Sequence, residues 1–203
     1  MSHYFTNENT PWEPCEVRFY FKGEPESFMS NPGVFSKDGL DYGTRVLLET
    51  LLEEDLKGEV LDLGCGAGYI GVLLKKYDPQ LSITMVDINE TAVELAKINS
   101  ERYGQSNTVA NMDGISSLTQ SFDVIVTNPP IRTGKKNVYR LFEEAYQHLN
   151  EDGRLFVVIR KQQGAESALK YLQTLGACNV VNKSNGYWVL CLKKSFDKLT
   201  IES

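Results

Sequence analysis

The sequence is poor in residues that bind metals and has no long apolar run. It contains two histidines, and its four cysteines form no Cys-x-x-Cys pair, so a zinc site is not expected. No run reaches the roughly 18 apolar residues of a membrane span, and the first residues lack the basic-then-apolar pattern of a signal peptide. We therefore expect reduced cysteines and a cytoplasmic protein.

An excess of positive charge is also missing. The formal net charge is −6, whereas a protein that holds naked nucleic acid by charge alone is usually basic. If the substrate is a nucleic acid, a local basic patch must contact it, or a preformed assembly must present it. The 203 residues suit one domain with a sizeable core.

Residues 59–71 predict a short buried strand, a glycine turn and a helix. The turn has glycine at every second position (Gly64, Gly66 and Gly68), which lets the backbone turn sharply and a ligand approach closely. Such a turn can hold a dinucleotide pyrophosphate, but the carboxylate of Asp62 would repel one and favours a cationic ligand. A glycine-rich turn without any ligand is the other interpretation.

The same stretch resembles motif I of the class I methyltransferases that depend on S-adenosylmethionine (SAM). That resemblance implies SAM as the cofactor. It also implies that the cofactor is held by the acid, the glycines and the cysteine of this stretch, namely Asp62, Gly64, Cys65, Gly66 and Gly68.

Strand and helix patterns alternate after residue 58, which predicts an α/β protein with a parallel sheet. Strands are expected near residues 59–63, 82–86, 106–110, 122–127, 154–159, 177–183 and 187–193, and helices near 69–77, 90–102, 114–118, 137–149 and 164–175. Asn185-Gly186 predicts a two-residue hairpin before the last strand. The resemblance implies a Rossmann-like fold with a mostly parallel seven-stranded sheet, an antiparallel C-terminal edge strand and helices on both faces.

We expect three parts along the chain. Residues 1–40 form an N-terminal appendage, with a strand over 16–22, a possible partner over 26–29 and a loop that is a candidate lid. Residues 41–195 form the methyltransferase domain, which opens with a helix over 41–54, and residues 196–203 form a polar tail.

Two acidic residues near strand ends are candidates for holding the cofactor. Asp87 ends the second strand of the domain, where an acid can accept both ribose hydroxyls of a nucleoside. By resemblance, Ile88 packs on the adenine, Asp113 accepts from the adenine amino group and Met112 covers the ring. The alternatives are a helix cap for Asp87 and an Asp-Gly turn for Asp113.

Asn128-Pro129-Pro130 follows the buried strand 122–127. Two prolines end a strand in a rigid turn, at the sheet edge where open α/β sheets bind ligands. The turn resembles the Asn-Pro-Pro motif of methyltransferases that act on planar, conjugated nitrogens. The side-chain oxygen of Asn128 and the carbonyl of Pro129 could accept both N–H bonds of the target amine. The alternative is a purely structural turn.

Ile131 follows, where adenine and glutamine methyltransferases usually carry an aromatic residue. With the segments 33–44 and 153–161, it makes the chain similar to small, single-domain members of the RsmC-like family of ribosomal RNA guanine-N2 methyltransferases. The resemblance implies methylation of a base amine in RNA, with guanine N2 of small-subunit ribosomal RNA favoured, and ribosomal RNA or the small subunit as partner. The alternatives are a protein glutamine or small-molecule methyltransferase, and a non-catalytic SAM-binding module for ribosome assembly.

Basic residues gather after the proline turn and on the next strand, and they predict contact with a phosphate-bearing substrate. They are Arg132, Lys135, Lys136, Arg140, Arg160 and Lys161. We expect substrate contacts from Ile131, Arg132, Lys135, Phe35 and Lys37, and base stacking could come from Phe35, Tyr42 or Tyr139. A solvated basic loop is the alternative, and the oligomeric state stays open.

Overall fold

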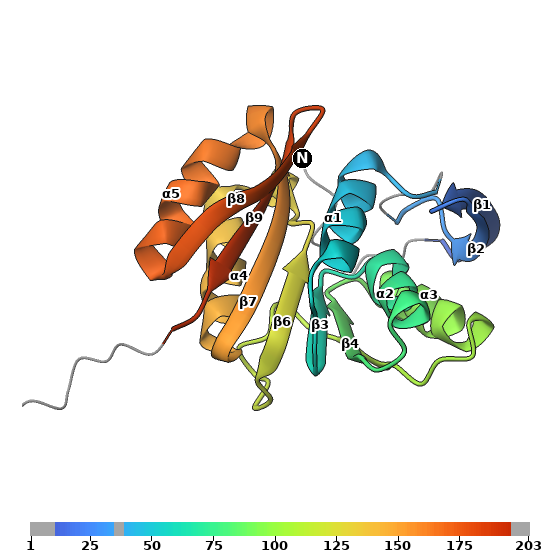
Figure 1. Ribbon diagram of the computed structural model, residues 1–203. Coiled ribbons are helices and arrows are strands. Elements are labelled where there is room, and N and C mark those ends of the chain that lie inside the picture. The colour runs from blue at the N-terminus through green and yellow to red at the C-terminus, as the bar shows by residue number, and fades with distance from the viewer. Residues whose placement is uncertain (1–10, 35–38, 196–203) are drawn as a thin grey trace, which may run out of the picture.

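In the computed structural model, which describes residues 11–34 and 39–195, a central sheet is covered by helices on both faces (Figure 1). Its seven strands lie in the order β5-β4-β3-β6-β7-β9-β8. Their bounds are β3 (Glu59–Leu63), β4 (Ser82–Asp87), β5 (Thr108–Asn111), β6 (Phe122–Thr127), β7 (Leu149–Arg160), β8 (Ala177–Ser184) and β9 (Tyr187–Lys193).

The predicted fold class is confirmed, with one correction at the sheet edge. β3 to β7 pair in parallel and β9 is antiparallel to its neighbours, but β9 lies between β7 and β8, so β8 is the edge strand. Burial explains the order. Val189, Leu190 and Leu192 of β9 are fully buried, as an inner strand requires, whereas β8 alternates exposed residues with buried or partly buried ones.

Helices α1 (Tyr42–Glu53), α2 (Tyr69–Tyr77) and α3 (Glu90–Arg102) cover one face of the sheet, and α4 (Lys135–Gln147) and α5 (Ala165–Leu175) cover the other. Because strand side chains alternate in direction, neighbouring residues belong to different cores. Val60 packs in the cluster under α1 and α2, and Leu61 packs in the cluster under α4 and α5. In the described part of the chain, no helix combines the length and apolar character needed to cross a membrane.

The helix expected near residues 114–118 is absent, and this prediction is wrong. The segment is a turn in which Gly114 has a φ of 68°, a left-handed value that interrupts a helix. The side chain of Glu144 on α4 accepts a hydrogen bond from the backbone N–H of Ile115 at 2.9 Å. This buried tertiary contact replaces the hydrogen bonds that a helix would have made.

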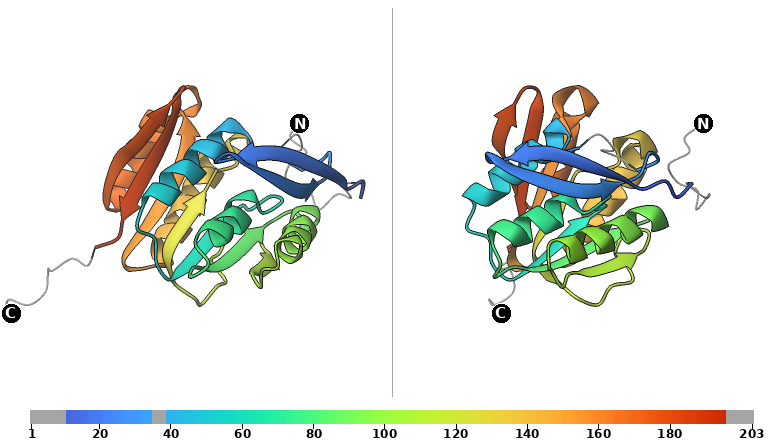
Figure 2. Two further views of the ribbon diagram at one scale, coloured as in Figure 1. Left: turned by 45° about the vertical axis from the view of Figure 1, so that its right-hand side comes forward. Right: turned by 90° about the vertical axis from the view of Figure 1, so that its right-hand side faces the viewer.

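The N-terminal hairpin, β1 (Cys15–Phe21) and β2 (Glu24–Ser30), forms its own small sheet and lies across α2 and α3 (Figure 2). Its Phe21 and Phe28 are fully buried in the same cluster as the main domain. The side-chain amide of Asn99 on α3 exchanges two hydrogen bonds with the backbone of Met29, at 2.7 and 2.9 Å. The hairpin therefore shares the core of the main domain and leads the chain toward the C-terminal ends of the parallel strands.

Candidate active site

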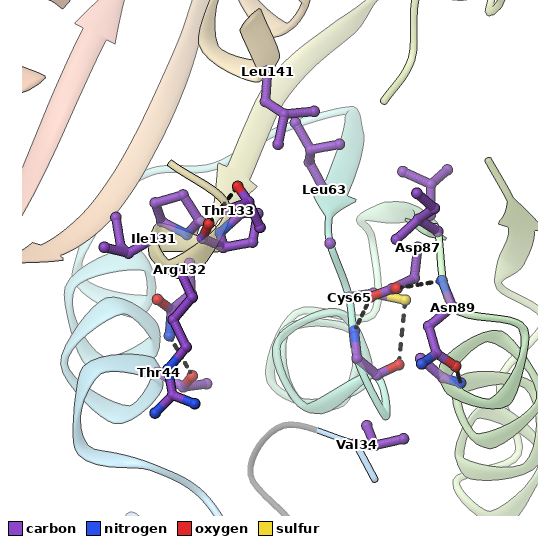
Figure 3. Close-up of a pocket in the computed structure, with 18 of the residues that line it drawn as sticks. Val34, Thr44, Leu63, Cys65, Asp87, Asn89, Ile131, Arg132, Thr133 and Leu141 are labelled. Atoms are coloured by element: carbon purple, nitrogen blue, oxygen red, sulfur yellow. Dashed lines mark hydrogen bonds between the residues drawn. The ribbon is translucent and has the colours of Figure 1, made fainter. Parts of the chain in front are cut away.

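A cavity of about 440 Å³ opens at the C-terminal ends of β3, β4 and β6, a size typical of small-molecule sites. Figure 3 shows Thr44, Ile131, Arg132 and Thr133 on one side of it, and Cys65, Asp87 and Asn89 on the other. Most of the predicted site residues line this cavity, namely Gly64, Cys65, Gly66, Asp87, Ile88, Met112, Asp113, Asn128, Pro129, Pro130, Ile131 and Arg132.

Three of the predicted residues that the structure describes are not part of the cavity lining. Asp62, Gly68 and Lys135 lie elsewhere in the fold, and Phe35 and Lys37 lie outside the described residues, as does the predicted tail over 196–203. Among the described residues, no group of histidine, cysteine, aspartate and glutamate side chains could hold a metal ion.

The glycine turn after β3 forms one side of the cavity. Gly64 and Gly66 have φ values of 76° and 55°, in the left-handed region that costs other residues roughly 1–2 kcal/mol. A Cβ atom at either position would meet nothing within 4 Å, so these glycines border open space. The amides of Gly64 and Cys65 both donate to the carbonyl of Val86 at 2.9 Å, which holds the turn against β4.

Asp87 ends β4 and faces the same turn. One carboxylate oxygen accepts from the N–H of Gly66 at 2.8 Å, and the other accepts from the N–H of Asn89 at 2.9 Å. Burial raises the pKa of Asp87, and these backbone hydrogen bonds oppose the rise. Asn89, not Asp87, caps α3, because its side chain accepts from the amides of Thr91 and Ala92. Each oxygen of Asp87 therefore keeps acceptor capacity for a ligand hydroxyl.

Asp62 lies behind the glycine turn. Its side chain is 1% exposed and accepts from the N–H of Gly71 in α2 at 3.2 Å. Its second oxygen has no hydrogen-bond partner among the described residues. Burial raises the pKa of Asp62 to about 7. Gly68 is similarly internal, since a Cβ there would lie 3.3 Å from Ala96.

The Asn-Pro-Pro turn forms the opposite side of the cavity. Pro130 has φ −76° and ψ 76°, the values of an inverse γ-turn. The N–H of Ile131 donates to the carbonyl of Pro129 at 2.9 Å, and the N–H of Thr133 donates to the carbonyl of Pro130 at 3.0 Å. The side-chain NH₂ of Asn128 donates to the hydroxyl of Thr44 at 3.2 Å. Local hydrogen bonds therefore hold the turn, and the side chain of Asn128 is hydrogen-bonded to a residue of α1.

Several of the predicted basic groups are engaged by neighbours. Arg140 contacts Asp113 at 2.7 Å and Glu144 at 2.9 Å, so its charge is balanced by two carboxylates. Lys135 lies over the ring of Tyr139, 5.3 Å from its centre. Arg132 and Arg160 line the cavity itself, which concentrates its positive charge beside the Asn-Pro-Pro turn.

Tyr187 on β9 is an aromatic residue of the cavity lining that the sequence patterns did not place at the site. It lines the cavity, its ring packs against Tyr42 at 5.6 Å, and the guanidinium of Arg160 lies 5.3 Å from its centre. The predicted candidate Tyr42 is thus a neighbour of the lining residue, and Tyr139 stacks on Tyr171 at 4.1 Å. The hairpin pattern placed Tyr187 at a strand start, but no local signal connected it with the cavity.

The model of the methyltransferase small domain family matches residues 26–191. The chain belongs to this family. The family and fold that the motifs predicted are thereby confirmed, as is the enzyme class at the level of the family, a SAM-dependent methyltransferase.

Two curated proteins are similar to this chain over most of its length. YbxB, an uncharacterised protein of Bacillus subtilis, is 41% identical over 184 residues, which span 87% of this chain and 90% of YbxB. Ribosomal RNA small subunit methyltransferase C of Haemophilus influenzae is 39% identical over 184 residues, spanning 85% of this chain and 53% of that protein. The present chain thus spans about half the length of this curated relative.

A solved relative has the same arrangement of elements. The structure of a T. thermophilus 16S rRNA N2 G1207 methyltransferase (RsmC), in complex with AdoMet and guanosine, superimposes with a TM-score of 0.81 at 25% identity. The match covers 92% of this chain and 52% of that chain.

Proposed function

We propose that this methyltransferase transfers a methyl group from SAM to an exocyclic amine of a base in RNA, and that its target is guanine N2 of small-subunit ribosomal RNA. One observation carries the proposal. The Asn128-Pro129-Pro130 turn faces the same cavity as the glycine turn and Asp87, so a target amine and a nucleoside cofactor would meet in one enclosed space.

The residues of the cavity fit SAM. The open space at Gly64 and Gly66 admits a ligand against the backbone, and Asp87 offers acceptor oxygens for the ribose hydroxyls. Ile88 and Met112 supply apolar contacts for the adenine. Asp113 also lines the cavity. One of its carboxylate oxygens accepts a hydrogen bond from Arg140, and the carboxylate would at the same time accept from the adenine amino group.

Asp62 fits a supporting role. Its carboxylate holds the start of α2 through Gly71, behind the turn rather than in the cavity. In its ionised form, Asp62 would favour a cationic ligand in front of the turn, because a buried charge is weakly screened. Gly68 contributes close packing at the same helix start.

The Asn-Pro-Pro turn would position the target amine. When bound, SAM supplies an electrophilic methyl group on a sulfonium. The side-chain oxygen of Asn128 and the carbonyl of Pro129 would each accept one N–H bond of the amine, which turns its lone pair toward the cofactor. The carbonyl of Pro129 already accepts from Ile131, and its second lone pair remains for the substrate. The same oxygens would stabilise the positive charge that develops on nitrogen.

The choice of RNA rests on charge and on similarity. Arg132 and Arg160 line the cavity of an otherwise acidic chain, where they could contact phosphates of an exposed nucleotide. The named relatives RsmC act on ribosomal RNA of the small subunit. We infer that ribosomal RNA, naked or within the small subunit, is the partner, and that the reaction takes place in the cytoplasm.

The test is transfer of labelled methyl groups from SAM to small ribosomal subunits that lack their native methylations. Naked ribosomal RNA, total protein and free guanosine serve as parallel substrates. We expect label in RNA as N2-methylguanine, strongly reduced but measurable in Asn128→Ala and retained in Asn179→Ala, a matched change at an exposed β8 position. Label in protein or small molecules alone would contradict the RNA assignment. SAM binding without any transfer would instead favour a non-catalytic assembly module.

A further inference from the structure

Asn128 is held through a short chain of side-chain hydrogen bonds that starts at α1. The hydroxyl of Thr44 donates to one carboxylate oxygen of Asp41 at 2.6 Å. The oxygen of the same hydroxyl accepts from the side-chain NH₂ of Asn128 at 3.2 Å. Asp41, Thr44 and Asn128 all line the cavity, and none of the predicted site roles includes Asp41 or Thr44.

The direction of these bonds decides which end of the Asn128 amide faces Thr44. A hydroxyl has one proton, and here the carboxylate of Asp41 takes it, because a carboxylate can only accept. The remaining lone pairs of the Thr44 oxygen can only accept a hydrogen bond. They therefore select the NH₂ end of Asn128 and leave its carbonyl oxygen for the substrate side. A charged acceptor makes this polarity stronger than a neutral one would.

The chain is anchored to a helix start. The other oxygen of Asp41 accepts from the N–H of Thr44 at 3.1 Å and caps α1. Packing holds the same turn in place, since a Cβ at Gly43 would lie 2.8 Å from the ring of Tyr187. Asp41 and Thr44 thus keep fixed positions relative to β9 and to the end of β6, as a group that orients another side chain must.

We propose that Asp41 and Thr44 are positioning residues that orient Asn128, so that its amide oxygen rather than its NH₂ group faces the substrate amine. This inference rests on the proposed function in one respect: it takes the substrate group to be a hydrogen-bond donor. With the opposite orientation, the NH₂ group of Asn128 would face the N–H bonds of an amine and repel them.

Three variants test the chain. Thr44→Val keeps the shape and removes the hydroxyl, Thr44→Ser keeps the hydroxyl, and Asp41→Asn keeps the helix cap but supplies an NH₂ donor that frees the Thr44 proton. We expect Thr44→Val and Asp41→Asn to lower kcat on the order of 10- to 100-fold, with little change in the Kd for SAM or in Tm. Thr44→Ser should recover most of the activity lost in Thr44→Val.

The coupling is tested in the Asn128→Ala background. If Thr44 acts through Asn128, Thr44→Val should add no further loss there, whereas independent roles would multiply. A loss of SAM affinity that parallels the loss of kcat would make Thr44 a cofactor ligand and overturn the proposal. Unchanged turnover in both Thr44→Val and Asp41→Asn would also overturn it.

A second measurement does not depend on the substrate. In ¹H–¹⁵N spectra, the side-chain NH₂ signals of Asn128, assigned by their loss in Asn128→Ala, should shift in Thr44→Val and stay near their original position in Thr44→Ser. If RNA methylation is not observed but these shifts occur, the proposed function fails and the positioning chain stands. If the Asn128 signals do not respond to Thr44→Val, the chain itself is refuted.

Discussion

Asp62 should make the stability of this protein fall as pH rises through the weakly acidic range. Its carboxyl group is buried, it accepts one backbone hydrogen bond, and its second oxygen has no partner among the described residues. Burial raises its pKa from the ordinary 3.8 to about 7. Between pH 3.8 and about pH 7, the folded state therefore keeps a proton that the unfolded state has lost. The free energy of unfolding is thus larger at the acid end of this range and falls as pH rises.

The size of the effect follows from the pKa values. A tenfold change in an equilibrium constant corresponds to about 1.4 kcal/mol. Ionised Asp62 should thus cost the folded state about 4 kcal/mol above pH 7, a cost absent below pH 3.8. Between pH 5 and pH 8, the part of this cost that develops is about 2.5 kcal/mol. Stability gained from the neutral form is present at low pH and is lost as pH rises through about 7.

Asp62→Asn removes the titration and keeps the shape of the side chain. Urea unfolding of both proteins at several pH values gives the difference in unfolding free energy, in which titrating groups that do not interact with Asp62 cancel. We expect the unfolding free energy of the variant to rise by about 2.5 kcal/mol relative to that of the wild type between pH 5 and pH 8. This change with pH does not depend on the difference in stability between the two proteins at pH 5. Asp152→Asn, at an exposed carboxylate, is the control for an Asp→Asn change at the surface. A flat difference for Asp62→Asn would refute the reasoning.

Three further variants probe the framework around the cavity. Gly71→Ala would place a Cβ 2.6 Å from the sulfur of Met85, and we expect a loss of about 1–3 kcal/mol of stability in urea unfolding. Asn99→Ala removes a fully buried amide that bonds Met29 twice and the carbonyl of Ala67 at 2.7 Å; a loss of about 3 kcal/mol is expected, and a change below 1 kcal/mol would contradict the anchoring role. Asp87→Asn would place an NH₂ group against a backbone N–H, and calorimetry should show SAM affinity reduced about tenfold or more.

Local patterns were sufficient for much of the fold. The predicted spans 59–63, 69–77, 90–102, 122–127 and 187–193 coincide with β3, α2, α3, β6 and β9. Each has a clear hydrophobic period and ends at a turn residue, so neighbours along the chain define it. The element near 114–118 failed because its conformation depends on Glu144, a residue that lies far away in the sequence.

The site, like the fold, has parts that local sequence patterns predict and parts that they do not. The glycine turn and the Asn-Pro-Pro turn are short segments whose backbone conformations follow from glycine and proline, so the sequence alone placed both at strand ends. Parallel strands carry their C-terminal ends to one edge, which is why both turns meet at one cavity.

Only the tertiary structure decided which side chains surround those turns. Thr44, Asn128 and Tyr187 line one cavity because β6, β7 and β9 follow one another in the sheet and α1 packs over β7 and β9, an order that no local period encodes. Side-chain direction was equally hidden: Asp62 faces α2 instead of the cavity. Pairing of charges across elements, as between Arg140 and Asp113, arises from contacts between distant segments, and these form only when the chain is folded.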